Sequence, residues 1–153
     1  MERTVVLVKP DGVQRGLIGE ILSRFERKGL HLIGLKMISL SDALLDEWYA
    51  HHKEKPFFAG LKQFMMSAPV VAMVWQGPAS ATVIRKMVGP TRASEAETGT
   101  IRGDFALSTQ YNIIHASETG EIAKKEIELM FRPEELFDWH KTDLSHIVAS
   151  EEK

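Results

Sequence analysis

The sequence contains no cysteine, and this absence removes several kinds of chemistry at once. Disulfide scaffolds, thiol nucleophiles and zinc sites built on thiolates are all excluded. Long apolar runs are missing too, since the N-terminal apolar stretch begins at Thr4 and already ends at the charged Lys9. That stretch is too short for a signal sequence or a membrane span. We therefore expect a cytoplasmic protein with no membrane partner.

Neither sign of charge is in excess, because 19 Lys and Arg face 21 Asp and Glu for a net charge of −2. No global field draws such a chain to nucleic acid, which we do not expect as a partner. Familiar site motifs are absent as well: there is no P-loop, no dinucleotide-binding glycine pattern, no HExxH, no EF-hand loop and no nucleophile elbow. A phosphate site would have to be assembled locally in another way.

What is present is the composition of one folded unit, with 153 residues, 44% hydrophobic and 26% charged. A chain of this length buries roughly two thirds of its unfolded surface. There is no internal repeat, linker or low-complexity stretch. The sequence predicts a single domain over residues 1–153, with a less distinctive C-terminal tail from about residue 141.

Hydrophobic periodicity predicts four strands alternating with helices. The expected strands are Thr4–Val8, His31–Leu40, Val70–Trp75 and Tyr111–Ala116, and the expected helices are Leu17–Lys28, 42–52 after a Ser41 cap, Leu61–Met66, Ser80–Val88 and a last one through Ile122 and Phe131. This alternation makes an α/β layer structure, but the pattern alone leaves parallel and antiparallel strand orders open.

Three connecting segments carry predictions of their own. Lys9–Gly12 is expected to be a turn after the first strand, and Ser117 is a candidate cap for the last helix. Residues 90–103 lack apolar periodicity and predict a long loop, and long ordered loops are usually functional. The tail after Arg132 is expected to be irregular.

His115 stands where the last strand gives way to a helix, a place where anions collect. It could equally be a buried structural histidine. Glu126 favours chemistry, because it lies on the apolar stripe of the helix, four residues after Ile122, and a buried carboxylate needs a partner. A carboxylate that fixes one imidazole tautomer leaves the other nitrogen free as a nucleophile. Otherwise Glu126 is a boundary residue that reaches solvent.

Other candidates are weaker when read from spacing alone. A candidate polyphosphate-binding site consists of three cations, Lys9, Arg85 and Arg102. Each of them taken singly is more often a surface charge. Phe57, beside the Pro56 break, could stack on a base or simply pack at the edge of the core. His51 and His52 are adjacent, so we expect them to face different sides of a helix, which argues against a metal pair.

Four segments, in order and well spaced, together resemble the nucleoside diphosphate kinase family. They are Lys9–Gly16 (KPDGVQRG), Lys55–Phe58 (KPFF), Gly99–Phe105 (GTIRGDF) and Asn112–Ser117 (NIIHAS). The resemblance covers the chain from about Glu2 to about Trp139. It implies a ferredoxin-like α+β sandwich, in which helices cover a four-stranded antiparallel sheet. It also implies a homo-oligomer, with a hexamer favoured over a tetramer.

The activity implied by the resemblance is a ping-pong phosphoryl transfer. The γ-phosphoryl group of a nucleoside triphosphate such as ATP or GTP would pass to His115 and then to a nucleoside diphosphate, with Mg²⁺ bridging the phosphates. Lys9 would take part in this chemistry, and Ser117 with Glu126 would orient the histidine. The residues that match the family's nucleotide contacts are Lys9, Tyr49, Phe57, Leu61, Arg85, Thr91, Arg102, Thr109 and Asn112.

Four residues at three places depart from the commoner family pattern. Glu118 replaces an aspartate near the expected water shell of the metal, Thr109 replaces an aliphatic residue beside the base, and Arg92-Ala93 replaces Asn-Pro. We expect no protein side chain to bind Mg²⁺ directly. The nucleotide phosphates would hold the ion, and Glu118 would contact it through water. The enzyme is thus the leading hypothesis, ahead of a nucleotide-binding module without turnover and a purely structural oligomer-forming domain.

Overall fold

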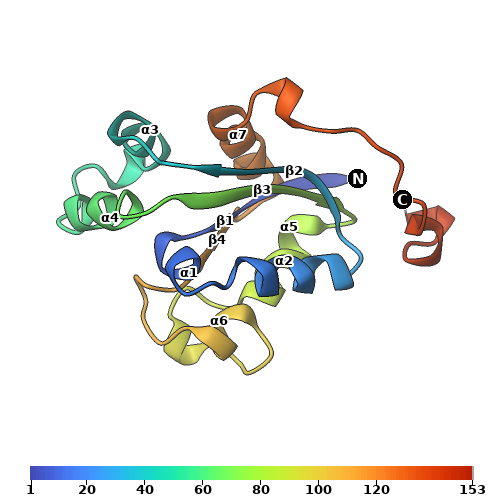
Figure 1. The fold of residues 1–153 in the computed structure, drawn as a ribbon, viewed down its shortest axis with the longest axis horizontal. Helices are drawn as coiled ribbons and strands as arrows, with labels where there is room; N and C mark the ends of the chain where they lie inside the picture. Colours follow the sequence, from blue (N-terminus) through green and yellow to red (C-terminus); the bar gives the residue numbers. More distant parts are fainter. Residues whose placement is uncertain (153) are drawn as a thin grey trace.

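The computed structural model describes residues 1–152 and is built around one four-stranded sheet (Figure 1). The strands are β1 (Glu2–Val8), β2 (His31–Ile38), β3 (Val70–Gly77) and β4 (Ile114–Ala116). They lie in the order β2-β3-β1-β4, and every neighbouring pair is antiparallel. This arrangement confirms the antiparallel α+β sheet that the family resemblance implied. Within residues 1–152, no helix is long and apolar enough to cross a membrane.

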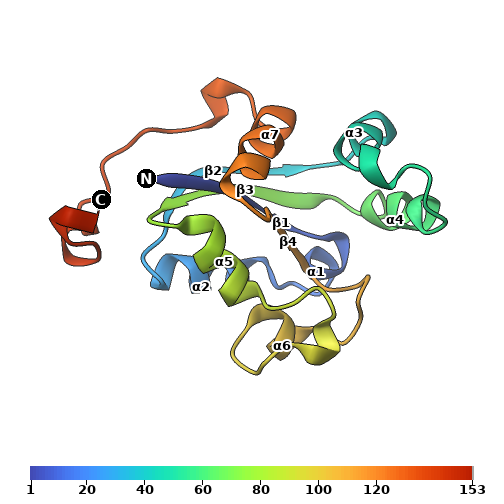
Figure 2. The same cartoon turned by 180° about the vertical axis from the view of Figure 1, so that it is seen from behind.

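Helices cover both faces of the sheet (Figures 1 and 2). One face carries α2 (Ile18–Arg27), α5 (Ser80–Val88) and α6 (Ile101–Phe105), and the other carries α3 (Asp42–Trp48), α4 (Phe58–Met65) and α7 (Gly120–Met130). A short helix, α1 (Pro10–Gln14), follows β1. Single 3-10 turns lie at Ala50–His52, Ala93–Glu95, Pro133–Glu135, Leu144–His146 and Ser150–Glu152.

The central strand β1 separates two hydrophobic clusters. Val6 and Val8 belong to the cluster under α2 and α5, whereas Val5 and Leu7 belong to the cluster under α3 and α7. This is the period-two alternation of a strand buried on both faces. On the neighbouring strand β4, the same alternation puts Ile114 and Ala116 in the first cluster. His115, between them, therefore faces the side of α3 and α7.

Two helix boundaries follow the predicted signals. Ser41 caps α3, because its hydroxyl oxygen accepts a hydrogen bond from the backbone N–H of Leu44 at 3.1 Å. Gly29, after α2, has a φ of +94°, the left-handed conformation that a glycine adopts at low cost. These local signals need no tertiary information, which is why the sequence located them correctly.

Two segments were predicted wrongly because short helices carry little periodicity. Lys9–Gly12 is not an isolated turn but leads into α1, where Pro10 occupies the first turn and Val13 N–H donates to Lys9 O at 3.0 Å. Residues 90–103 are not wholly irregular, since they contain a 3-10 turn and the start of α6. Gly103 lets α6 form there, because a Cβ at this position would collide with Glu97 O.

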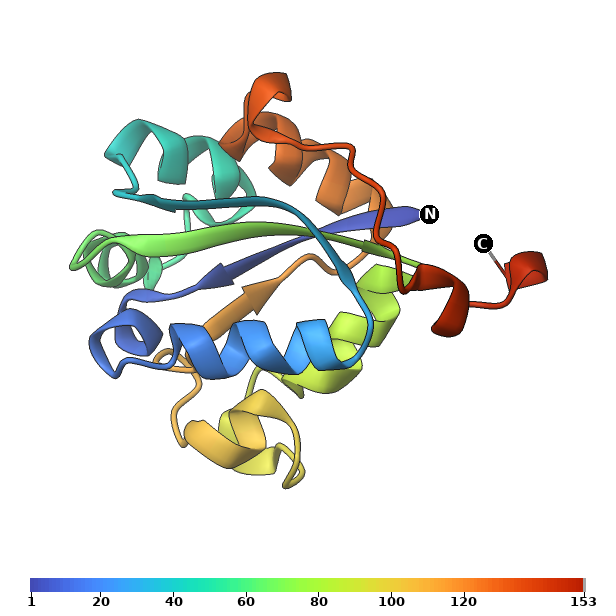
Figure 3. The same ribbon diagram turned by 45° about the vertical axis from the view of Figure 1, so that its right-hand side comes forward.

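The tail after α7 runs back along β2 and then leaves the sheet, as the red end of the ribbon in Figure 3 shows. Three hydrogen bonds attach it to β2: Lys36 Nζ donates to Glu135 Oε2 at 2.6 Å, Phe137 N–H donates to Ile33 O at 2.8 Å, and Trp139 Nε1–H donates to Leu32 O at 3.1 Å. Its only regular pieces within 1–152 are single 3-10 turns. The prediction of an irregular tail is therefore confirmed.

Candidate active site

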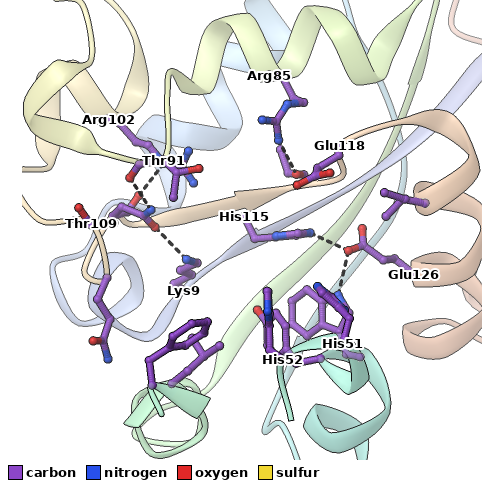
Figure 4. Close-up of a pocket in the computed structure, with 18 residues that line it drawn as sticks. Lys9, His51, His52, Arg85, Thr91, Arg102, Thr109, His115, Glu118 and Glu126 are labelled. Atoms are coloured by element: carbon purple, nitrogen blue, oxygen red, sulfur yellow. Dashed lines mark hydrogen bonds and ion pairs between the residues drawn. The ribbon is translucent and has the colours of Figure 1, made fainter. Parts of the chain in front are cut away.

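A cavity of about 630 Å³ opens beside β4, between α3, α5 and α7 (Figure 4). Every candidate residue from the sequence except Ser117 lines it. These are Lys9, Tyr49, Phe57, Leu61, Arg85, Thr91, Arg102, Thr109, Asn112, His115, Glu118 and Glu126. Segments more than a hundred residues apart thus meet in one place.

At the centre of the cavity, His115 is held by a buried carboxylate. His115 Nε2 lies 2.9 Å from Glu126 Oε1, and the hydroxyl of Ser117 donates to Glu126 Oε2. Burial alone would raise the pKa of Glu126, but the hydrogen bond and charge of His115, with further bonds from Ser117 and Trp48, hold it below its usual value. An ionised carboxylate only accepts hydrogen bonds, so Nε2 carries the proton and the Nδ1 lone pair is free.

The prediction that Ser117 caps the last helix was wrong. The cap of α7 is Thr119, whose hydroxyl oxygen accepts a hydrogen bond from Ile122 N–H at 3.2 Å. Ser117 is instead fully buried, and its oxygen accepts a hydrogen bond from Val5 N–H at 3.2 Å. It therefore ties Glu126 to the central strand β1, a long-range role that a local capping pattern does not reveal.

Just before β4 the backbone makes a strained turn. Ile113 has a φ of +73°, a conformation that is costly for a β-branched residue, and Ile114 N–H donates to Asn112 O at 2.8 Å across it. Two further bonds hold the turn, from Lys9 N–H to Ile113 O at 2.8 Å and from Ile113 N–H to Asp11 Oδ2 at 2.9 Å. The turn shortens β4 relative to the predicted strand, and strain of this kind is typical of functional sites.

Hydrogen bonds from Arg102 hold this turn in place. Its guanidinium donates to three backbone carbonyls, those of Asn112 at 3.3 Å, Gly89 at 3.0 Å and Ile114 at 2.6 Å. Burial, reinforced by the nearby Arg85, lowers its pKa to about 10, although Asp11 opposes the shift. The group stays charged at neutral pH, and a guanidinium has five N–H donors, so two remain for a ligand. Arg102 lies in α6 rather than in the predicted loop.

Lys9, at the end of β1, points into the cavity and donates to Asn112 Oδ1 at 2.8 Å. The other end of this amide is also fixed, because Asn112 Nδ2–H donates to Thr91 O at 3.0 Å. Burial, together with the positive charge of Arg102, lowers the pKa of Lys9 to about 8, against a smaller opposite effect of Asp11. Two cations are thus held close together, and the charge of Asp11 offsets them only in part, so the arrangement favours binding of an anion.

The outer part of the cavity is aromatic. Phe57 is 52% exposed at the mouth, and His52 packs edge-on against it with ring centroids 5.3 Å apart. Deeper in, burial and the charge of Glu126 raise the pKa of Tyr49 well above its usual value, so its hydroxyl stays protonated. An exposed aromatic face beside a charged interior suits a ligand with one flat apolar end and one anionic end.

Several lining residues were missed in the sequence, namely Trp48, His51, His52, Gln110, Ala116 and Ile122. The expectation that His51 and His52 face different sides was wrong, since their ring centroids lie 3.9 Å apart and both line the cavity. They lie in the single 3-10 turn Ala50–His52 that follows α3, rather than inside the predicted α-helix. No group of three or more His, Cys, Asp or Glu that could bind a metal occurs within residues 1–152.

Comparisons with known proteins point to one family. The family model described as "Nucleoside diphosphate kinase" matches residues 2–136. A nucleoside diphosphate kinase of Synechococcus sp. (strain CC9902) is 57% identical over 142 residues, 93% of this chain and 94% of that one. The corresponding protein of Thermus thermophilus is 57% identical over 136 residues, 89% of this chain and 99% of that one.

Solved structures of nucleoside diphosphate kinases also match the fold of this chain. A halophilic nucleoside diphosphate kinase from Halobacterium salinarum in complex with CDP superimposes with a TM-score of 0.94 at 46% identity, covering 96% of this chain and 98% of that one. A nucleoside diphosphate kinase family protein from Babesia bovis also reaches 0.94, at 47% identity, and covers 97% of this chain and 100% of the other. From sequence, fold and site geometry together, the chain belongs to the nucleoside diphosphate kinase family.

Proposed function

We propose that this chain transfers the γ-phosphoryl group of a nucleoside triphosphate to a nucleoside diphosphate through a phosphohistidine on His115. The observation that carries the proposal is the pair formed by His115 and Glu126. The carboxylate holds Nε2–H at 2.9 Å, and this leaves the Nδ1 lone pair as a nucleophile without need of a separate base.

In the first half-reaction, Nδ1 attacks the γ-phosphorus as the bond to the β,γ-bridging oxygen breaks, and the nucleoside diphosphate leaves. In the second half-reaction, a terminal oxygen of another diphosphate attacks the same phosphorus and the N–P bond breaks, so atoms and charge balance over the cycle. Glu126 stabilises the positive charge that the imidazole acquires while it is phosphorylated. Such a reaction depends mainly on alignment and on neutralised charge.

The positive charge for the phosphates comes from three cations around the cavity, Lys9, Arg85 and Arg102. Arg102 and Lys9 are fixed by the hydrogen bonds described above, whereas Arg85 makes one long bond, from Nη1–H to Ala116 O at 3.4 Å. Arg85 is therefore the least constrained of the three. Polar contacts to phosphates and sugar hydroxyls are assigned to Tyr49, Thr91 and Asn112.

Phe57 is the proposed platform for the base, with Leu61 and Thr109 lining the same mouth. Stacking on an aromatic face tolerates every base, because each base has a π-face. We therefore expect a broad range of nucleotides, ATP and GTP among them.

The site also fits a magnesium ion held mainly by the nucleotide. Glu118 lines the cavity and has no side-chain hydrogen bond to any residue in 1–152, whereas the oxygens of Glu126 are occupied by three donors. Mg²⁺ prefers oxygen ligands and keeps several waters, so Glu118 would contact it through water. When bound, the ion neutralises charge on the phosphates.

The same proposal includes assembly into a homo-oligomer, a hexamer rather than a tetramer, and a cytoplasmic location with access to nucleotide pools. Leu35 and Met37 support self-association, since they are 51% and 58% exposed on β2, which lies at the edge of the sheet. Sedimentation equilibrium of the purified chain measures the mass directly. A mass of six chains is expected, and a mass of one or four chains contradicts the hexamer.

The activity is tested by incubating the protein with γ-labelled ATP and Mg²⁺, then adding GDP. The proposal predicts an acid-labile, alkali-stable label on His115 that GDP removes as labelled GTP. Binding of nucleotide without any label would favour a binding module that lacks turnover. The ionised Glu126 and the free Nδ1 argue against that alternative, since a pure binding site has no use for an activated imidazole.

A further inference from the structure

Trp48 shares a carboxylate oxygen with the candidate nucleophile. Its indole Nε1–H donates to Glu126 Oε1 at 2.8 Å, and the same oxygen lies 2.9 Å from His115 Nε2. The two rings also meet directly, with centroids 4.9 Å apart and planes at 89°. Trp48 closes α3, so this contact joins α3, β4 and α7 at one atom.

This geometry restricts the imidazole in two ways. A carboxylate oxygen offers two lone-pair directions, and the indole N–H occupies one, which leaves a single direction for Nε2–H of His115. The perpendicular indole ring stands against the imidazole and opposes its rotation. Trp48 is itself held, because it stacks on Tyr49 with centroids 4.5 Å apart and planes at 22°.

We infer that Trp48 is a positioning residue of the phosphoryl-transfer site: its N–H fixes Glu126 Oε1, and its ring keeps Nδ1 of His115 aimed into the cavity. This inference rests on the function proposed above. The indole N–H is a third donor to the Glu126 carboxylate, beside those of Ser117 and His115. No motif match identified Trp48.

The electrostatic consequence has a definite sign. Each hydrogen bond to the carboxylate spreads its negative charge, and loss of one leaves Glu126 a stronger base. A stronger base retains a proton on the Glu126 and His115 pair up to a higher pH. Protonation at Nδ1 removes the nucleophile, so the acid limb of phosphoenzyme formation moves to higher pH when the indole N–H is lost.

Other charges near His115 are the same in wild type and in a Trp48→Phe variant. The cavity holds the cations Lys9, Arg85 and Arg102, the carboxylates Glu118 and Glu126, and the titratable side chains Tyr49, His51 and His52. Trp48→Phe changes none of these, and it preserves an aromatic ring while deleting the one donor. A shift of the acid limb in this variant therefore reports the lost hydrogen bond.

Trp139 offers a matched control. Its ring stands at 85° to His31 with centroids 4.3 Å apart, and its Nε1–H donates to Leu32 O at 3.1 Å. Trp139→Phe thus deletes one indole donor beside one histidine at the other edge of the sheet. No carboxylate accepts that indole hydrogen bond.

The experiment measures single-turnover labelling with γ-labelled ATP between about pH 5 and 8 in wild type, Trp48→Phe and Trp139→Phe. For Trp48→Phe we expect about a tenfold slower labelling at saturating ATP, the value of one hydrogen bond to a charged group. We also expect an acid limb raised by about half a pH unit, with ATP affinity within roughly twofold of wild type. Trp139→Phe should match wild type in all three.

An unchanged rate and acid limb in Trp48→Phe would overturn the inference, and so would a loss confined to ATP affinity. Wild type that acquires no label on His115 would instead overturn the proposed function, so the two failures are distinguishable. A measurement on wild type guards against a variant that does not fold. The indole N–H resonance of Trp48 should titrate with the midpoint of the acid limb, whereas a flat response contradicts the shared oxygen.

Discussion

Two histidines in this fold meet a tryptophan edge-on, at opposite edges of the same sheet. His115 of β4 meets Trp48 of α3, and His31 of β2 meets Trp139 of the tail. At β4 the imidazole and the indole both donate to Glu126. At β2 the indole donates to a backbone carbonyl, and Nε2 of His31 is buried without a hydrogen-bond partner among residues 1–152.

The contrast between His31 and His115 shows that contact with a tryptophan ring does not by itself make a histidine reactive. Burial, aided by Lys141, lowers the pKa of His31 against the opposing charges of Asp138 and Asp143, so His31 is a neutral, structural imidazole. His115 has the same type of ring contact but adds a buried carboxylate on one nitrogen and an open cavity with cations on the other side. The carboxylate and the cavity, rather than the histidine itself, define the candidate site.

The largest expected effect is the loss of the nucleophile. His115→Gln should reduce labelling by γ-labelled ATP by about 10⁴-fold or more, as expected when a covalent nucleophile is removed. His31→Gln should label like wild type. A comparable loss in His31→Gln, with an intact fold by circular dichroism, would contradict the contrast between the two histidines.

Removing the charge of the carboxylate should have the next largest effect. Glu126→Gln is expected to slow phosphoenzyme formation by between about 10²- and 10⁴-fold, because the amide neither fixes the tautomer nor stabilises an imidazolium. Glu128→Gln, two residues along the same helix but exposed, is the control. Equal rates for the two variants would show that Glu126 does not orient His115.

A smaller effect should appear at high pH. Since the pKa of Lys9 is lowered to about 8, its ammonium loses charge as the pH rises through that value, and kcat/KM for ATP should fall above it. Lys9→Arg keeps the charge and should flatten this basic limb, whatever its effect on the maximal rate. Lys36→Arg, on β2, should keep the wild-type profile. A basic limb that persists in Lys9→Arg assigns the titration to another group.

The smallest expected effect concerns stability at the other histidine. Because the pKa of His31 in the folded protein lies below its ordinary value of 6.5, the unfolded chain binds more protons as the pH falls through that region. Protonation therefore favours unfolding, and His31 contributes to the loss of stability on acidification. His31→Phe should weaken the pH dependence of the unfolding free energy between about pH 7 and 5, measured by urea titration, and leave activity unchanged. An unchanged slope contradicts this sign.

Local sequence signals were sufficient to predict helix ends and one buried carboxylate. Ser41 and Gly29 mark helix ends, and the position of Glu126 on the apolar stripe of its helix indicated a buried, partnered carboxylate. The antiparallel direction of the strands, by contrast, came only from the family resemblance, because alternation of strands and helices fits parallel and antiparallel sheets equally.

Contacts between distant segments account for what the sequence did not reveal. Ser117 was expected to act with Glu126, but the hydrogen bond that its oxygen accepts from Val5 N–H of β1 depends on the fold. Trp48 ends an amphipathic helix like any aromatic residue of the core, and only the placement of α3 against α7 brings its N–H to Glu126. The γ-turn at Ile113 has no sequence signal, because a β-branched residue is the last expected at positive φ.

The role of Glu126 is tested most directly by identifying which ring nitrogen of His115 carries the phosphoryl group. Two-dimensional ¹H, ¹⁵N and ³¹P NMR of the phosphoenzyme, kept at alkaline pH, distinguishes the two isomers of phosphohistidine. Phosphorus bonded to Nδ1, with a proton retained on Nε2, is the result expected if Glu126 fixes the tautomer. Phosphorus on Nε2, or on a residue other than His115, would contradict the account.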